Sequence, residues 1–143
     1  QLAAIAKWLN ARGYKKLPLG QGISFDAIPQ GSYSFHINVP VILEGSERKV
    51  NIAIDVAIMP LKANSGDIPV LFEAKSAGDF TNVNKRRKEE AAKMSQLKFT
   101  YGKVSFNLFL CGYFDSGYLG YEAAEGIDWV WEHRIDDMQE FGL

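Results

Sequence analysis

Cysteine is almost absent from the sequence, since Cys111 is the single one among 143 residues. One cysteine excludes an intrachain disulfide and a cysteine-based zinc site, and it fits a reducing compartment such as the cytoplasm. The residue lies within the apolar run NLFLCGYF. A free cysteine packs as a small hydrophobic side chain, so we expect Cys111 in the core.

Long apolar runs and an excess of one charge are also missing. No run approaches the roughly 20 apolar residues that a membrane-spanning helix needs, which predicts no membrane partner. The 16 basic and 17 acidic residues give a net charge of −1. Such a chain has no overall positive field, so a nucleic acid would have to bind to a local basic patch.

The remaining composition is that of a folded globular domain. Apolar residues make up 47% of the chain and charged residues 23%, which argues against disorder. A length of 143 residues suits one domain with a hydrophobic core and is short for two. The sequence begins with Gln1 inside a helical pattern, and we interpret it as part of a longer or a processed chain.

Periodicity predicts an α/β fold with a mixed β-sheet flanked by helices. We expect helices over 2–12 and 83–98, and strands over 33–43, 49–58, 68–75, 104–111 and the tail segment DWVWEHR. The first two strands are expected to form a hairpin, and a connection rich in Gly and Tyr precedes the tail strand. Five alternating apolar residues of the strand 49–58 are expected to share one face: Val50, Ile52, Ile54, Val56 and Ile58.

Three ionisable residues interrupt these apolar strands. Asp55 lies within the strand 49–58, and Glu73 and Lys75 end the next strand, where a separation of two residues places both on one face. If the two strands are neighbours, the three side chains converge. Two facing carboxylates repel each other and favour a hard cation such as Mg²⁺ between them. A lysine beside that cation can stabilise developing charge or help to deprotonate an attacking water.

The same residues also have a purely structural interpretation. Single charged residues at strand ends are common, and a Glu-x-Lys motif often occurs by chance. The spacing of Asp55 and Glu73 suits two strands joined by one loop, and this favours the functional interpretation.

A run of cations, KRRK over 85–88, follows in the first turns of the helix 83–98. Cations at a helix N-terminus oppose the helix dipole, at about 0.3–1 kcal/mol each when exposed. A solvated helix face is the structural interpretation, but a DNA backbone against the helix explains why the cations gather at this end. Asparagine reads adenine edges, and it also caps helices. We predict that Lys85, Arg86 and Lys88 contact DNA phosphates. We also predict DNA contacts by Asn82 and Asn84.

The order of Asp55 and then Glu73-Ala74-Lys75 resembles the D…(D/E)-x-K signature of the PD-(D/E)XK nuclease superfamily. Ile54 stands where that name suggests proline, at a position that varies in the superfamily. The stretches EAKSAGDFTNVNKRRKEEA and LCGYFDSGYLGYEAAEGIDWVWEHRIDD are similar to type II restriction endonucleases of the XamI type. The nuclease signature covers residues 50–111, and the closer resemblance extends nearly to the end of the sequence.

This resemblance implies a restriction-endonuclease-like core and a Mg²⁺-dependent, site-specific endonuclease acting on double-stranded DNA. It implies that Asp55, Glu73 and the backbone carbonyl of Ala74 bind the metal, and that Lys75 positions or activates the attacking water. It also implies a homodimer, because a twofold-symmetric DNA site needs a twofold-symmetric protein. We therefore interpret residues 1–143 as a single nuclease catalytic domain and as the C-terminal part of a longer chain.

Two other functions stay open from the sequence. A repair, recombination or mobile-element nuclease with low sequence specificity would use the same fold and site. A non-catalytic DNA-binding or assembly module is the other alternative, and it would be favoured if Asp55 and Glu73 failed to converge.

Overall fold

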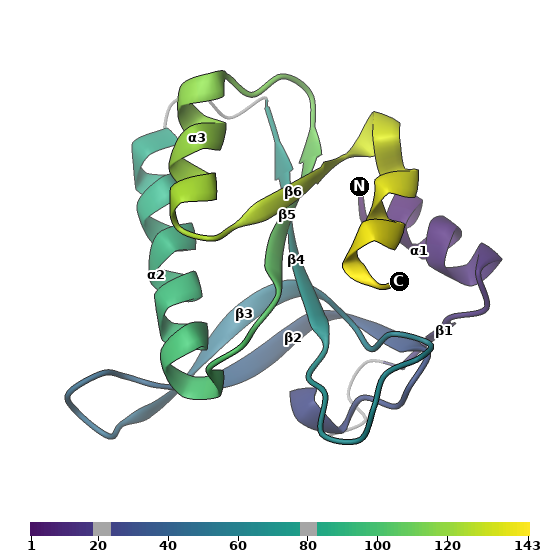
Figure 1. Cartoon of the computed structure of the whole chain (residues 1–143), viewed down its shortest axis with the longest axis horizontal. Helices are drawn as coiled ribbons and strands as arrows, with labels where there is room; N and C mark the ends of the chain where they lie inside the picture. Colours follow the sequence, from purple (N-terminus) through teal and green to yellow (C-terminus); the bar gives the residue numbers. More distant parts are fainter. Residues whose placement is uncertain (19–23, 78–82) are drawn as a thin grey trace.

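The computed structural model describes residues 1–18, 24–77 and 83–143, which contain a six-stranded sheet (Figure 1). The strands lie in sequence order: β1 Lys15–Lys16, β2 Ser32–Ile42, β3 Lys49–Ile58, β4 Val70–Ser76, β5 Phe106–Cys111 and β6 Asp128–Trp131. The pairs β2–β3 and β3–β4 are antiparallel, whereas β1–β2, β4–β5 and β5–β6 are parallel. The predicted mixed sheet and the predicted hairpin are therefore confirmed.

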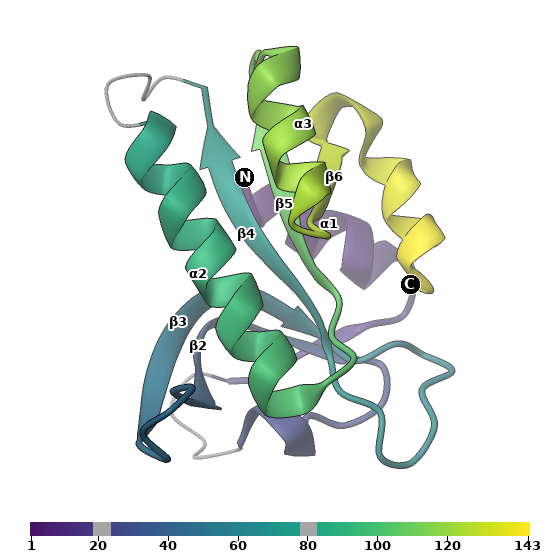
Figure 2. The same cartoon turned by 60° about the vertical axis from the view of Figure 1, so that its left-hand side comes forward.

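Helices cover both faces of this sheet. On one face lie α2 (Val83–Tyr101) and α3 (Ser116–Ala124), and on the other lie α1 (Leu2–Ala11) and the 3₁₀ segment η3 (Glu132–Phe141) (Figures 1 and 2). A short 3₁₀ turn, η1 (Phe25–Ala27), precedes β2. Each of α2 and α3 connects two parallel strands and is thus the crossover of a βαβ unit. Within the described ranges, no helix is long and apolar enough to cross a bilayer.

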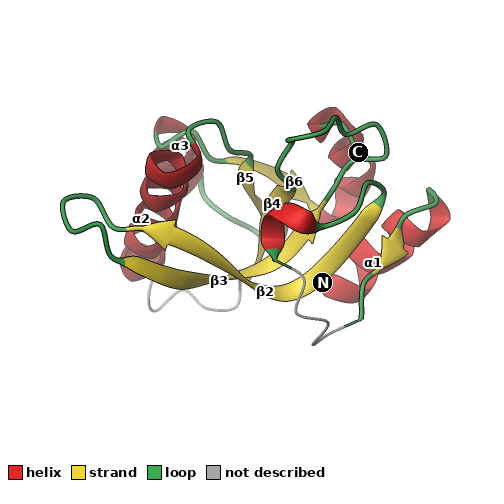
Figure 3. Cartoon of the chain, turned by 90° about the horizontal axis from the view of Figure 1, so that it is seen from below, coloured by secondary structure: helices red, strands yellow, loops and turns green. Residues whose placement is uncertain are grey.

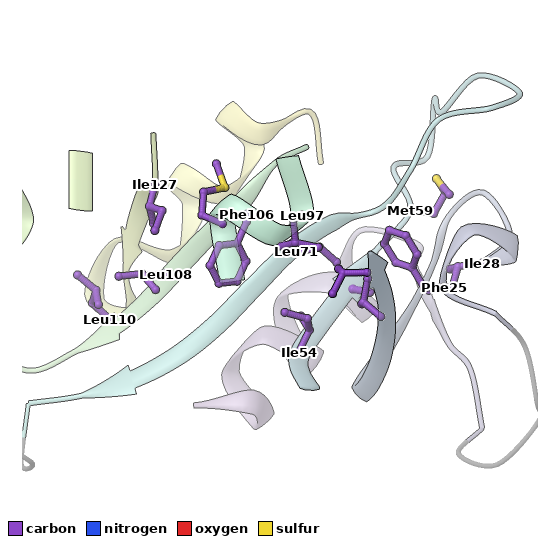
Figure 4. Close-up of a cluster of buried hydrophobic side chains, with 14 of the residues drawn as sticks. Phe25, Ile28, Ile54, Met59, Leu71, Leu97, Phe106, Leu108, Leu110 and Ile127 are labelled. Carbon is purple, nitrogen blue, oxygen red and sulfur yellow. The ribbon is translucent and has the colours of Figure 1, made fainter. Parts of the chain in front are cut away.

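Alternating side chains of the central strands build one apolar core on each face of the sheet. Leu71 of β4 and Leu108 of β5 pack on the side of α2, together with Leu97 of that helix. The next residues along the two strands, Phe72 and Phe109, pack in the second core on the side of α1. Figure 4 shows the first core, where side chains from both strands and from α2 gather. The strands β4 and β5 are thus buried on both faces, as their apolar sequences predict.

The strand β3 contributes to both cores, which corrects one expectation. Ile54 packs in the core beneath α2, whereas Val56 and Ile58 pack in the core beneath α1, so the five alternating residues do not share one face. In β2, His36 has a left-handed backbone with φ of 52°, at the level of Asp55, and interrupts the regular alternation there. Figure 3 shows the long strands β2 and β3, which run from α2 at one end of the molecule to α1 at the other.

The connection rich in Gly and Tyr is helical in the structure, as α3, and its prediction as an irregular connection is wrong. Asp115 caps this helix, because its side chain accepts the backbone N–H of Tyr118 at 2.8 Å. Tyr118 and Glu122, one turn apart, are the buried residues of α3. Packing of this side against α2 therefore outweighs the weak helix propensity of its glycines.

Two further expectations about the tail of the chain need correction. Cys111 is the last residue of β5 and is half-buried, with a hydrogen-bonding contact to Glu132, so it does not lie in the core. The tail strand β6 ends at Trp131, and the residues EHR that follow begin η3.

Candidate active site

The site lies where β3 and β4 separate. Their ladder joins residues 56–58 to residues 70–72 and stops there, although both strands continue. Asp55 and Glu73 are the first residues beyond the ladder on each side. The backbone N–H of Ala74 donates to Oδ2 of Asp55 at 2.9 Å, so a carboxylate replaces the backbone acceptor that a continued ladder would supply. Asp55 is in this way fixed against β4.

The carboxyl of Glu73 is buried at the same point, with 4% of the residue exposed. Its Oε1 accepts a hydrogen bond of 2.6 Å from Nζ of Lys93, which also donates to the carbonyl of Ala53 at 2.8 Å. Burial and a hydrogen-bonding contact with Asp55 raise the pKa of Glu73 from 4.5 to about 7, although the Lys93 ammonium acts in the opposite direction. The two predicted carboxyl groups therefore converge, and one ammonium does not neutralise them.

Lys75 points to the same helix as Glu73, as the separation of two residues predicts. Its Nζ lies 3.6 Å from Oε1 of Glu90 on α2. Glu90 and Lys93 are three residues apart on that helix, so they share its inward side. Lys93 of α2 therefore pairs with Glu73 of β4, and Glu90 of α2 pairs with Lys75 of β4.

Sequence reasoning missed Glu90 and Lys93. A signal for both was present, because Met94 and Leu97 are buried and the stripe that they define continues toward the N-terminus of α2 through positions 90 and 93. The backbone carbonyl of Lys75 has another partner that was not predicted: the side chain of Gln1 donates to it at 2.7 Å. The start of α1 therefore lies beside the end of β4.

The donor set fits a hard divalent cation such as Mg²⁺. Asp55 and Glu73 supply carboxylate oxygens, and Ala74 between Glu73 and Lys75 supplies a carbonyl. In the described part of the chain, no three His, Cys, Asp or Glu side chains converge as a complete metal cage. Mg²⁺ is typically held by one or two carboxylates while it keeps several waters, so a larger cage is not needed. Burial and the contact with Asp55 raise the pKa of Glu73 to about 7, and a positive charge beside the pair favours its ionised form.

Two of the predicted DNA-contacting side chains are described, and both are exposed. Lys85 and Lys88 lie in the first two turns of α2. This end of the helix follows the C-terminal end of β4, so it lies at the same edge of the sheet as the converging charges (Figure 2). Asn82, which was also predicted to contact DNA, lies outside the described residues. The side chains of Asn84 and Arg86 also lie outside the description.

Comparison with known proteins agrees with this geometry. The profile of the XamI restriction endonuclease family matches residues 1–131. The type II restriction enzyme SalI of Streptomyces albus G is 55% identical over 143 residues, which cover 99% of this chain and 44% of that enzyme. The chain thus spans less than half the length of this curated relative. The match over almost the whole chain confirms the resemblance found in the sequence, and the chain belongs to the XamI restriction endonuclease family.

Proposed function

We propose that this chain carries the catalytic centre of a type II restriction endonuclease, which hydrolyses phosphodiester bonds of double-stranded DNA at a specific site with Mg²⁺. Family membership and the name of the similar enzyme support the activity. The observation that carries the proposal is the convergence of the Asp55 and Glu73 carboxyls at the end of the β3–β4 ladder, with Lys75 two residues further along β4.

In this proposal, the carboxylates of Asp55 and Glu73 and the carbonyl of Ala74 hold the ion. A divalent cation held there would stabilise the negative charge that develops on the phosphate and would make an attacking water more acidic. Asp55 keeps its orientation through the N–H of Ala74, so one carboxylate is fixed before the ion binds. Oε1 of Glu73 would bind the ion either in place of the hydrogen bond from Lys93 or while it still accepts that bond.

Lys75 supplies the third function, because its ammonium donates hydrogen bonds to the attacking water or to a phosphate oxygen. The water oxygen forms a bond to phosphorus and gives up a proton to the solvent, while the bond from phosphorus to the leaving sugar oxygen breaks and that oxygen takes up a proton from the solvent. The distance of 3.6 Å from Nζ of Lys75 to Glu90 is that of an ion pair and is longer than an ordinary hydrogen bond. The ammonium therefore keeps donors available for the reacting groups.

The exposed cations of α2 support a DNA substrate at this edge of the sheet. Lys85 and Lys88 contact phosphates in the proposal and bring the backbone to the carboxyl pair. We expect Arg86, Asn82 and Asn84 to add contacts to the same DNA. A homodimer is part of the proposal, because two equivalent cuts in a twofold-symmetric site need two equivalent centres. Light scattering of the purified protein on its own and with DNA measures this state.

Cleavage of plasmid DNA by the natural-length protein tests the proposal, with Mg²⁺ or with a chelator. The Glu73→Gln variant is compared with Glu140→Gln, a substitution at an exposed position of η3. We expect discrete fragments that need Mg²⁺, that are lost in Glu73→Gln and that persist in Glu140→Gln. A Mg²⁺-dependent smear would replace the proposal with a nuclease of low specificity. DNA binding with no cleavage in any divalent metal would replace it with a binding module.

A further inference from the structure

A second group of buried carboxyls lies between α2 and α3, directly behind Lys75. Glu90 is 2% exposed, and its two carboxylate oxygens accept the hydroxyl of Tyr118 at 3.0 and 2.9 Å. Oε1 of the same carboxylate faces Nζ of Lys75 at 3.6 Å. Glu90 therefore ties the lysine of the proposed site to α3, through a hydroxyl group that is itself buried.

Glu122 completes this group from one turn further along α3. It is 1% exposed, and neither of its carboxyl oxygens meets a hydrogen-bond donor among the described residues. Burial and the contact with Glu90 raise the pKa of Glu122 to about 9, while the charges of Lys75 and Arg87 act in the opposite direction. Burial therefore favours the uncharged form of Glu122, which lies in hydrogen-bonding contact with Glu90.

The Glu90 carboxylate is the centre of this group. It accepts from Tyr118, lies in hydrogen-bonding contact with Glu122 and faces the positive charge of Lys75. The buried Tyr118 hydroxyl restricts the position of this carboxylate, and the contact with Glu122 adds to that restriction. The arrangement therefore fixes the carboxylate first and the ammonium through it.

We propose that Glu90, held by Tyr118 and Glu122, is a positioning residue that keeps the Lys75 ammonium in place for phosphodiester hydrolysis. This inference rests on the proposed function of Lys75. It assigns a role to α3, which the three residues of the proposed catalytic set do not include. It also explains why a helix with two glycines presents a tyrosine and a glutamate to α2 as its buried residues.

Single-turnover cleavage by the natural-length protein, with DNA affinity measured separately in Ca²⁺, tests the role of Glu90. We expect Glu90→Gln to lower the cleavage rate by at least about tenfold, because a misplaced group slows the chemical step, while DNA affinity is unchanged. Glu89→Gln, at the exposed neighbouring position, should leave both quantities unchanged. In a Lys75→Ala background, Glu90→Gln should have no further effect, since it acts through that lysine.

A purely structural role of Glu90 would give an additive loss in the Lys75→Ala background together with a lower melting temperature, and this result would overturn the inference. An unchanged rate in Glu90→Gln, with Lys75→Ala inactive, would overturn the inference and leave the proposed function intact. Full activity of Lys75→Ala would instead overturn the proposed function of the lysine, and the inference with it.

Two milder substitutions decide the matter if Glu90→Gln does not fold. Tyr118→Phe removes one hydroxyl, and we expect a rate lower by about two- to tenfold, again with no further loss in the Lys75→Ala background. Glu122→Gln keeps a neutral donor of the same shape, so its rate should stay within about twofold of the unchanged protein. A large loss in Glu122→Gln, or none in Tyr118→Phe, would contradict the inference.

Discussion

The buried carboxyl of Glu73 predicts how metal binding depends on pH. Burial and Asp55 raise the pKa of Glu73 to about 7, so near neutral pH this carboxyl is divided between its protonated and ionised forms. A divalent cation binds the ionised form and displaces the proton, which makes binding weaker as the pH falls below the pKa. For a pKa near 7, the dissociation constant is about tenfold higher at pH 6 than at pH 8, equivalent to about 1.4 kcal/mol. At pH 6, close to one proton leaves for each ion bound.

Isothermal titration of the natural-length protein with Ca²⁺ measures both quantities, in pairs of buffers that differ in ionisation enthalpy. Ca²⁺ takes the same oxygen ligands as Mg²⁺. Glu73→Gln has no proton to exchange at this position, so the variant should bind more weakly and release no proton. Glu140→Gln, exposed on η3, should behave like the unchanged protein. Equal affinities at pH 6 and pH 8, or full proton release by Glu73→Gln, would refute the reasoning.

Three further predictions concern α2. Lys93→Ala should raise the pH at which Ca²⁺ binding reaches half its full strength, because Lys93 lowers the pKa of Glu73; a shift to lower pH would contradict this. Replacing Lys85 and Lys88 by alanine should reduce the salt dependence of DNA affinity by about 2 in logarithmic slope, measured by fluorescence anisotropy; an unchanged slope would remove them from the interface. Leu97→Ala should lower the free energy of unfolding in urea by about 2–5 kcal/mol, because this side chain is fully buried, and a loss below about 1 kcal/mol would contradict the packing.

The convergence of the Asp55 and Glu73 carboxyls, with Lys75 on the same face of β4 as Glu73, was accessible from the sequence because it depends on short-range rules. Alternation places Glu73 and Lys75 on one face of β4. The single loop between β3 and β4 makes these two strands neighbours and brings Asp55 to Glu73. The exact place of Asp55 was less accessible. The sequence predicts a regular alternation through β3, whereas the left-handed backbone of His36 in the neighbouring strand breaks it. A period-two pattern in one strand carries no information about such a residue in another.

The role of α3 was not accessible from local propensity. Its glycines and tyrosines favour an irregular connection, whereas the packing of Tyr118 and Glu122 against α2 favours a helix. Glu90 and Lys93 were missed for a related reason, since charged residues on a helix are usually solvated. They are buried or half-buried here because β4 presents charges of the opposite sign to them.

The most direct test of the central claim is the single-turnover cleavage rate of Lys75→Ala in Mg²⁺, beside its affinity for the same DNA in Ca²⁺. Lys62→Ala, in the exposed loop before β4, is the matched control. The account predicts a rate lower by about 100-fold or more for Lys75→Ala, with affinity within a few-fold of the control. Cleavage by Lys75→Ala at the rate of the control would contradict the assignment of the active site to the end of the β3–β4 ladder.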